Sequence, residues 1–586
     1  MSKVNYYHKD KGYFRLPPNL ANYQSTSHNF SWEKASKSEL TWLEDGKINA
    51  AYNAVDRHLG TFRKNKIALY WEGASGETQK YTFEELTNLS NRFGNYLKDL
   101  GVIRGDRVFI FLPRIPYLYI SFLGILKIGA IAGTLFSAFQ EQALFDRLDN
   151  SQAKILITNN ELSQRIKNIR KKLPHLKHII LVDQLGFSDE LDQYSSSLHI
   201  ARMDKEEYAF MLYTSGTTGK PKGVVHKHLA ILSEHVTAKF VLDLHDEDTY
   251  WCTADPGWVT GIAYEILGSW SNGVASVVYE GRFDAEKWYQ IIEKYKISIW
   301  YTAPTAIRML MAKEMSLIKK HDLSSLRHLL SVGEPLNPEA IRWGIRAFGL
   351  PFHDTWWQTE TGAICIANYP CLDIKIGSMG KPIPGITAEI IDDKGKILPA
   401  GQEGNLALLP GWPSMMKTIW RRPEKYKSYF LPSKVISRNS WYISGDRARK
   451  DKDGYFWFIG RADDVIKTSG ERVGPFEVES ALVEHPAVIE AGVIGKPDPL
   501  RGEIIKAFVV LNEEQKLKVK SQKYAEDLKI ELSGYVKKHL AGHAYPREIE
   551  FIDKLPKTRS GKIMRRILKA KELGLSIGDT STLEEY

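Results

Sequence analysis

The sequence has few cysteines and no secretory leader pattern. Its 586 residues include only Cys252, Cys365 and Cys371, and none of them stands in a CxxC or Cys/His metal-ligand spacing. This excludes a disulfide framework and a structural zinc site, and reduced thiols predict a cytoplasmic protein. The N-terminal stretch MSKVNYYHKDKGYFRLPPNL has no apolar segment, so we expect no signal peptide there.

Charge of one sign is not concentrated anywhere in the chain. The 80 Lys and Arg residues exceed the 70 Asp and Glu residues, which gives a net charge of +10, but no block of five consecutive basic residues occurs. A basic balance favours acidic partners, either nucleic acid or a phosphorylated small molecule. Because no basic block is present, a nucleic-acid-binding protein is the weaker hypothesis, and an enzyme with an anionic substrate is the stronger one.

The chain also lacks a clean membrane span. The stretch from Tyr117 to Phe139 is long enough in principle, but Lys127 stands near its middle. We interpret it as a buried helix at 117–128 followed by a short strand at about 130–135. No membrane span is therefore expected.

Continuous apolar runs alternate with helical segments from about residue 105 onward. The runs occupy residues 107–112, 154–158, 178–182, 276–280, 298–302 and 328–332. Such runs are typical of strands that helices cover on both faces, so they predict an α/β fold with mainly parallel sheets. At roughly 150 residues per domain, the length corresponds to about four domain-sized units.

The pattern changes twice after the α/β region. Residues 378–460 contain short alternating strands between Gly and Pro, which predicts a β-rich subdomain. Beyond about residue 462 the pattern is α+β, with helices at 475–484 and 525–540. We therefore predict a large N-terminal domain over 1–462 and a small C-terminal domain over 463–586.

The first chemical motif is YTSGTTGKPKGVVH at 213–226, directly after the apolar AFML. Its glycines allow close backbone approach, and its N–H groups, hydroxyls and lysines can bind phosphate oxygens. It is not a Walker A loop, because Pro221 follows the Gly-Lys pair. The competing interpretation is a flexible surface loop.

Three further motifs follow. HDTWWQTETG at 353–362 places a glutamate after a strand, where it can bind Mg²⁺ or a hydroxyl, although the two tryptophans could be core residues. In the run at 444–482, Asp446 follows an apolar strand and suits a ribose diol. PKTRSGKIMRR at 556–566 holds Lys562 in a turn. Taken singly, the charged residues of the last two motifs could equally be solvated surface.

In this order and spacing, the four motifs resemble the adenylate-forming superfamily of acyl-CoA synthetases, luciferases and peptide-synthetase adenylation domains, over roughly residues 25–575. WWQTETG, SVGEPLNPEA at 331–340 and DPGWVTG at 255–261 narrow the resemblance to the acetyl-CoA synthetase branch. It implies that a carboxylate attacks the α-phosphorus of ATP and that CoA then displaces AMP from the acyl-AMP. Implied substrates and cofactors are acetate, ATP, Mg²⁺ and CoA. Propionate or another short-chain acid, a carrier-protein-loading enzyme and an inactive scaffold remain as alternatives.

The resemblance also implies roles for single residues in adenylation. Lys562 is the implied catalytic lysine on a mobile C-terminal domain, Thr359 lies near the α-phosphate, and Glu360 holds Mg²⁺. Relatives also place Mg²⁺ at main-chain carbonyls that match Val483, His485 and Val488. The implied nucleotide site comprises Thr214, Ser215, Gly216, Thr217, Thr218, Gly219, Lys220, Lys222, Gly333, Glu334, Pro335, Asp354, Thr355, Trp356, Trp357, Gln358, Thr359, Asp446, Arg461 and Arg472.

The remaining implied roles concern the second half-reaction and specificity. Asp463 matches the hinge between the domains. The acyl pocket is implied to be lined by Val259, Thr260, Val332 and Trp357, and CoA is implied to contact Thr260, Ser469, Gly470 and Lys537. An indole at position 357 leaves room for only about one or two carbons beyond the carboxylate, since a steric wall rejects longer chains. A lysine acetyltransferase and a deacetylase acting on Lys562 are possible partners by the same resemblance.

Overall fold

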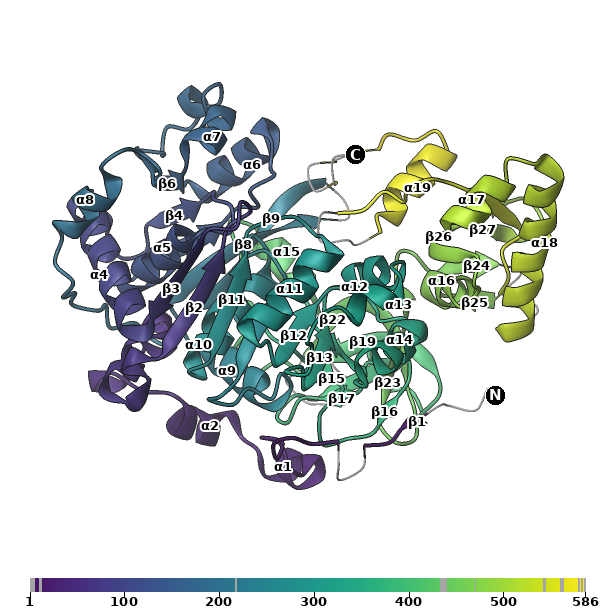
Figure 1. Cartoon of the computed structure of the whole chain (residues 1–586), viewed down its shortest axis with the longest axis horizontal. Coiled ribbons are helices and arrows are strands. Elements are labelled where there is room, and N and C mark those ends of the chain that lie inside the picture. Colours follow the sequence, from purple (N-terminus) through teal and green to yellow (C-terminus); the bar gives the residue numbers. More distant parts are fainter. Residues whose placement is uncertain are drawn as a thin grey trace.

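The computed structural model describes residues 6–9, 13–216, 219–432, 440–468, 471–540, 544–558, 563–577, 580 and 583. Within these residues, two large sheets form the framework of the N-terminal part (Figure 1). The strands of the first sheet, in spatial order, are β17 (Lys381–Pro382), β15 (Ile366–Ala367), β14 (Phe352–Trp356), β13 (His328–Ser331), β12 (Ile299–Thr302), β10 (Thr249–Cys252), β11 (Ala275–Tyr279), β2 (Ile67–Glu72) and β3 (Thr78–Thr82).

The second large sheet contains the glycine-rich motif. Its strands, in spatial order, are β20 (Thr418–Ile419), β9 (Gly219–Lys227), β8 (Tyr208–Gly216), β5 (Ile131–Thr134), β4 (Arg107–Ile110), β6 (Ile155–Thr158) and β7 (His178–Leu181). Neighbouring strands from β14 to β2 in the first sheet, and from β8 to β7 in the second, run parallel. The six apolar runs of the sequence correspond to β4, β6, β7, β11, β12 and β13, so these six strands were predicted correctly.

Helices cover the faces of both sheets. Residues of α4, α5 and α9 share one hydrophobic cluster with strands β2 and β4, so these helices pack between the two sheets. The helices of this part are α1 (Tyr23–Asn29), α2 (Trp32–Glu39), α3 (Ala50–Ala54), α4 (Phe83–Asp99), α5 (Pro116–Lys127), α6 (Glu141–Ser151), α7 (Asn160–Ser163), α8 (Phe187–Asp192), α9 (Ala230–Phe240), α10 (Gly268–Ser271), α11 (Ala285–Tyr295), α12 (Pro304–Met311), α13 (Met315–Ile318), α14 (Pro338–Phe348) and α15 (Pro423–Lys427).

The apolar stretch at 117–139 is the buried helix α5 followed by strand β5, as predicted. Lys127 is fully buried at the end of this helix, and its Nζ lies 3.0 Å from Asp56. A paired charge of this kind can be kept in a protein interior. Among the described residues, no helix has the length and apolar character needed to cross a bilayer.

The β-rich region after residue 378 forms a third sheet. Its strands, in spatial order, are β18 (Ala388–Ile391), β19 (Glu403–Leu408), β22 (Ser440–Lys450) and β21 (Phe430–Pro432). Strand β23 (Phe456–Arg461) also pairs with β22. Its strands are antiparallel. The short, turn-rich alternating pattern of the sequence predicted this change of architecture.

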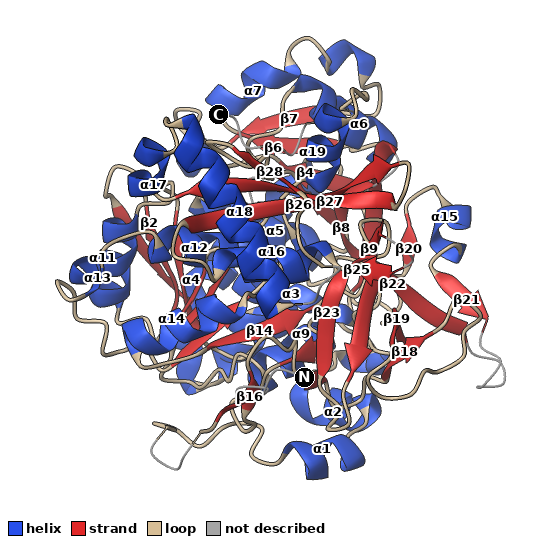
Figure 2. Ribbon diagram, turned by 90° about the vertical axis from the view of Figure 1, so that its right-hand side faces the viewer, coloured by secondary structure: helices blue, strands red, loops and turns tan. Residues whose placement is uncertain are grey.

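The C-terminal part has its own sheet and its own core. It orders β25 (Glu471–Val473), β24 (Ile466–Thr468), β27 (Gly502–Leu511) and β26 (Val488–Asp498), with β28 (Glu548–Phe551) beside β27. Helices α16 (Pro475–Val483) and α18 (Gln522–His539) pack on this sheet (Figure 2), and α17 (Glu513–Lys518) and α19 (Arg565–Glu572) complete the unit. Its main hydrophobic cluster runs from Ile466 to Ile549, apart from the clusters of the large sheets.

Candidate active site

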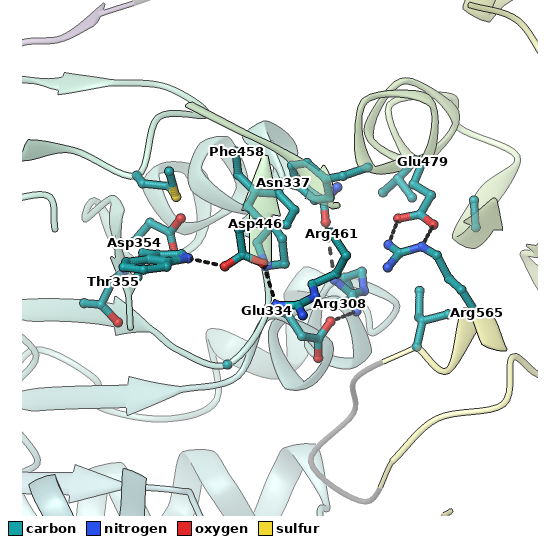
Figure 3. A pocket seen from close by; sticks show the side chains of 18 of the residues that line it. Arg308, Glu334, Asn337, Asp354, Thr355, Asp446, Phe458, Arg461, Glu479 and Arg565 are labelled. Atoms are coloured by element: carbon teal, nitrogen blue, oxygen red, sulfur yellow. Dashed lines mark hydrogen bonds and ion pairs between the residues drawn. The ribbon is translucent and has the colours of Figure 1, made fainter. Parts of the chain in front are cut away.

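A cavity lies between the large N-terminal part and the C-terminal unit (Figure 3). Residues at the carboxyl ends of β13 and β14 line it, which is where ligands bind in open α/β sheets. Of the residues with an implied nucleotide role, the cavity brings together Gly333, Glu334, Pro335, Asp354, Thr355, Trp356, Trp357, Gln358, Asp446 and Arg461.

The loop after β13 depends on a glycine. Gly333 has φ of +93°, a left-handed conformation that side-chain-bearing residues adopt only with strain. This turn brings Glu334 and Pro335 to the cavity before α14 begins at Pro338. The SVGEP sequence thus forms part of the cavity wall.

The carboxylate of Asp446 is held by neighbouring donors. Trp356 Nε1 donates to Asp446 Oδ2 at 3.0 Å, and Gln358 Nε2 donates to the same oxygen at 3.1 Å. Arg461 Nη1 donates to Oδ1 at 2.9 Å (Figure 3). An anionic carboxylate fixed in this way is a preorganised hydrogen-bond acceptor at the cavity wall.

Asp354 has a different environment from Asp446. Burial raises the pKa of the Asp354 carboxyl to about 7, although Ser331 and the backbone N–H of Thr355 donate to its Oδ1 at 3.1 and 3.0 Å. Near neutral pH this carboxyl can therefore act as either a hydrogen-bond donor or an acceptor in the cavity.

The glycine-rich motif forms a β-hairpin rather than a single turn. Strands β8 and β9 pair antiparallel, with Thr214 opposite Lys222 and Gly216 opposite Gly219. Ser215 lies on β8 and Lys220 lies on β9. Thr217 and Thr218 lie outside the described residues. Within the described part of the chain, the hydroxyl oxygen of Thr214 is buried without a hydrogen-bond partner. An orphaned hydroxyl of this kind suits a ligand oxygen.

Lys222 and Glu360 form a buried ion pair beside this hairpin, with Lys222 Nζ 2.8 Å from Glu360 Oε1. Tyr429 Oη donates to the same carboxylate oxygen at 3.0 Å. Burial alone would raise the pKa of Glu360, but Lys222 and Tyr429 outweigh it and lower that pKa. Glu360 is therefore ionised and available as an oxygen ligand.

Trp357 lines the cavity. Its indole Nε1 donates to Tyr301 Oη at 3.3 Å, and Tyr264 packs against the ring at 5.1 Å in a T-shaped arrangement. The ring also packs against two hydrophobic clusters, one that includes Val259 and one that includes Val332. Thr260 is buried at the start of the helical segment that follows Val259.

Four other residues with implied roles are not among those that line the cavity. Arg472 is exposed on β25, and Lys537 is exposed in the last turn of α18, where it stacks over Tyr545. Thr359 is half-buried next to Glu360. Asp463 lies in the turn between β23 and β24, 3.6 Å from Arg461 Nε.

Of the three C-terminal residues proposed as main-chain metal ligands, only Val483 lines the cavity. The ring of His485 pairs with Glu531 at 3.2 Å and packs against Tyr535. Val488 is buried at the start of β26. No cluster of His, Cys, Asp and Glu able to hold a metal occurs among the described residues.

Lys562, Ser469 and Gly470 lie outside the described residues. The neighbouring Ile563 lines the cavity, and it forms an antiparallel bridge with Lys557. Ile563, the residue after Lys562, therefore lies at the cavity.

The cavity also contains polar residues to which the sequence analysis gave no role. Arg308 and Asn337 line it from the N-terminal part, and Glu479 and Arg565 from the C-terminal part. Arg565 donates to both carboxylate oxygens of Glu479, at 2.8 and 2.6 Å. Two features of the sequence could have indicated these residues. One is Arg308 within the apolar PTAIRML segment, and the other is Arg565, three residues after Lys562 in the last motif.

Known proteins resemble the chain over nearly its full length. It is 56% identical over 576 residues to acetyl-coenzyme A synthetase of Bacillus subtilis strain 168, covering 97% of this chain and 98% of that protein. It is 42% identical to acetyl-coenzyme A synthetase of Methanothrix thermoacetophila, covering 92% and 86%.

Solved structures show the same architecture. An anthranilate CoA ligase in complex with anthranoyl-AMP matches with a TM-score of 0.81 and 32% identity, covering 92% of this chain and 99% of that one. An acyl-CoA synthetase of Brucella canis matches with a TM-score of 0.71 and 35% identity, covering 95% and 99%.

Family descriptions match both parts of the chain. The AMP-binding enzyme family matches residues 55–420, and the AMP-binding enzyme C-terminal domain matches residues 477–562. These matches include the glycine-rich hairpin, the strands that end at the cavity and the segment leading to Lys562. The chain therefore belongs to the AMP-binding enzyme family, and it is an adenylate-forming enzyme with a large α/β N-terminal part and a small α+β C-terminal domain.

Proposed function

We propose that the chain ligates acetate to CoA through an acetyl-AMP intermediate, giving acetyl-CoA, AMP and pyrophosphate. We choose acetate because of the position of Trp357, which lines the cavity together with Thr355 and Trp356. An indole in this place would exclude longer acids. The 56% identity to an acetyl-coenzyme A synthetase supports the same choice. Propionate is the second candidate, since one extra methylene changes binding by only about 1–3 kcal/mol.

Nucleotide binding uses the residues that the cavity brings together. The fixed carboxylate of Asp446 accepts hydrogen bonds from the ribose hydroxyls, and Glu334 and Pro335 border the base. The β8–β9 hairpin offers its backbone N–H groups, the hydroxyl of Thr214 and the ammonium of Lys222 to the phosphates. Thr359 lies on the same side, next to Glu360.

Glu360 fits a Mg²⁺ ion carried in with the nucleotide. Its carboxylate is ionised and sits beside the phosphate hairpin, and hard oxygen donors are what Mg²⁺ prefers. The ion would neutralise phosphate charge while the carboxylate approaches the α-phosphorus. Lys222 then leaves Glu360 for the phosphates, because both partners gain a new counter-charge.

Lys562 orients the acid and neutralises the oxygens of the α-phosphate during adenylation. We place the hinge at Asp463, so that the small domain turns about it after adenylation and presents Ser469 and Gly470 to the CoA thiol. The AMP-binding enzyme C-terminal domain family matches residues 477–562, within the part that would turn. Acetylation of Lys562 by a lysine acetyltransferase would remove its charge and stop adenylation, and a deacetylase would restore it.

The test is AMP release with ATP, Mg²⁺ and CoA across a panel of acetate, propionate, butyrate, octanoate and anthranilate. We expect acetate to give the highest kcat/KM and butyrate and longer acids to give little release. Preference for propionate would establish the second candidate. AMP release that needs no CoA but a carrier protein would contradict the proposal.

A further inference from the structure

Arg308 joins the nucleotide pocket to the C-terminal domain. It projects from α12 in the N-terminal part, and its Nη2 donates to Glu334 Oε2 at 2.9 Å. Its Nε lies 3.5 Å from Oε1 of Glu490, which belongs to β26 of the C-terminal domain. The guanidinium is 7% exposed, so both interactions lie largely out of solvent.

Glu490 in turn holds the base of the segment that carries Lys562. Lys557 Nζ lies 2.6 and 2.5 Å from the two carboxylate oxygens of Glu490. Lys557 pairs with Ile563 in an antiparallel bridge, and the N–H of Met564 donates to the carbonyl of Pro556 at 2.8 Å. Lys557 and Ile563 are therefore held side by side, and Lys557 is tied to Glu490.

A second contact reinforces the same docking. Arg308 Nη1 donates to Asn337 Oδ1 at 3.3 Å, and Asn337 Nδ2 donates across the domain boundary to Ser480 Oγ at 2.9 Å. Asn337 directly precedes α14, and Ser480 lies on α16. Arg308 thus contacts the C-terminal domain through Glu490 and also holds Asn337, a second residue that contacts this domain.

The charges along this line alternate in sign from Glu334 through Arg308 and Glu490 to Lys557. When the domains separate between Arg308 and Glu490, each side keeps a neutral pair: Arg308 with Glu334, and Lys557 with Glu490. No buried charge is left without a partner, so the contact can break without the large penalty of an orphaned ion. Its longest link, at 3.5 Å, is the one that crosses the domains.

We propose that Arg308 is a positioning residue that locks the C-terminal domain in the adenylating arrangement and couples this lock to the nucleotide pocket through Glu334. This inference rests on the proposed function for the identity of the two half-reactions. The lock acts on adenylation, where Lys557 and Ile563 must lie beside the cavity, and it is released before CoA attacks.

The kinetic test uses Arg308→Gln and, from the other side of the boundary, Glu490→Gln. We expect each to slow acetate-dependent ATP–pyrophosphate exchange by about 10- to 100-fold, with less than about threefold change in thioester formation from supplied acetyl-AMP. The double variant should be no slower than the slower single variant. Arg342→Gln is the matched control, because it removes another cross-domain ion pair, Arg342–Glu484 at 3.3 Å, which lies at the more exposed rim.

A measurement without turnover separates this inference from the proposed function. Spin labels at Glu286→Cys on α11 and Ile530→Cys on α18, in a Cys371→Ser background, report the distance between the domains. We expect Arg308→Gln and Glu490→Gln to broaden that distance distribution and Arg342→Gln to leave it as in the unaltered chain. A wild-type chain that ignores acetate would contradict the proposed function alone. Equal losses in both half-reactions, additive effects, or an unchanged distance distribution would overturn the lock.

Discussion

Lys222 Nζ lies 2.8 Å from Glu360 Oε1, so the cation expected at the phosphates is paired with the carboxylate expected at the metal. Tyr429 donates to the same oxygen and also contacts Lys222. Lys222 and Tyr429 together lower the pKa of Glu360 and so keep its carboxylate charged before substrate arrives. The pair therefore keeps two functional charges buried and ready.

Removing the lysine from this pair should destabilise the fold. Lys222→Met leaves Glu360 buried without its cation, and we expect a loss of about 3 kcal/mol in the free energy of unfolding at pH 7.5. Because the pKa of Glu360 is lowered in the folded chain, its stabilising contribution is complete above the unfolded value of about 4.3 and is lost as the pH falls through the lowered value.

The difference between wild type and Lys222→Met should accordingly be largest at pH 7.5 and shrink below about pH 4. Denaturant unfolding at a series of pH values measures it. Lys425→Met on α15 is the control, because Lys425 is exposed and its Nζ lies 5.4 Å from the ring centre of Tyr429. A difference that does not depend on pH would show that Lys222 acts through packing.

Asp446→Asn tests the ribose contact. The change keeps the size of the side chain but removes its charge and half of its acceptor capacity, so we expect kcat/KM for ATP to fall by about 10- to 100-fold. The wild type should favour ATP over 2′-deoxy-ATP, and the variant should lose most of that preference. Asp451→Asn, just after the same strand but paired with Lys375, should retain the preference.

Lys562→Ala separates the two half-reactions. We expect adenylation to fall by at least about 100- to 1000-fold, because the residue stabilises charge in the transition state. Thioester formation from supplied acetyl-AMP should stay close to the wild-type rate. The comparison requires pyrophosphate exchange and acetyl-CoA formation from the same preparation, and equal losses in both would point to misfolding or a shared role.

Trp357→Gly tests the acyl wall. Removing the indole should lower activity with acetate and admit carboxylates of about four to eight carbons, since each buried methylene contributes about 0.8 kcal/mol. The fold should lose about 3 kcal/mol, because the ring packs against two hydrophobic clusters. Kinetics with acetate and octanoate beside a thermal melt distinguish the outcomes. A folded variant that keeps strict acetate selectivity would remove the basis for a short-chain substrate.

Local sequence patterns predicted many of the strands, and ten of the residues with an implied nucleotide role line the cavity. An apolar run such as 328–332 indicates β13 because a strand covered on both faces has no polar side, and the SVGEP turn follows it directly. The pairing of Lys222 with Glu360 could not be predicted in this way. Each residue had a separate motif role, and their contact depends on how strand β9 of one sheet meets the turn that follows β14 of the other.

The sequence indicated the contact between Arg308 and Glu490 even less. The residues lie in different domains, and the sequence around each is that of an ordinary helix or strand. Only the docking of the domains brings them within 3.5 Å. Arg472 is the opposite case. The resemblance implied a role at the phosphates, but in this arrangement the residue is exposed on β25.

Trp357 is held at the junction of two hydrophobic clusters, and this has a consequence for how such an enzyme can diversify. A lineage that moves toward longer acids must first acquire stability elsewhere. The substitution that deepens the pocket also removes packing contacts with both hydrophobic clusters. The order in which mutations can accumulate is thereby constrained. Acid preference in this fold should change through stabilised ancestors rather than by a single replacement at the wall.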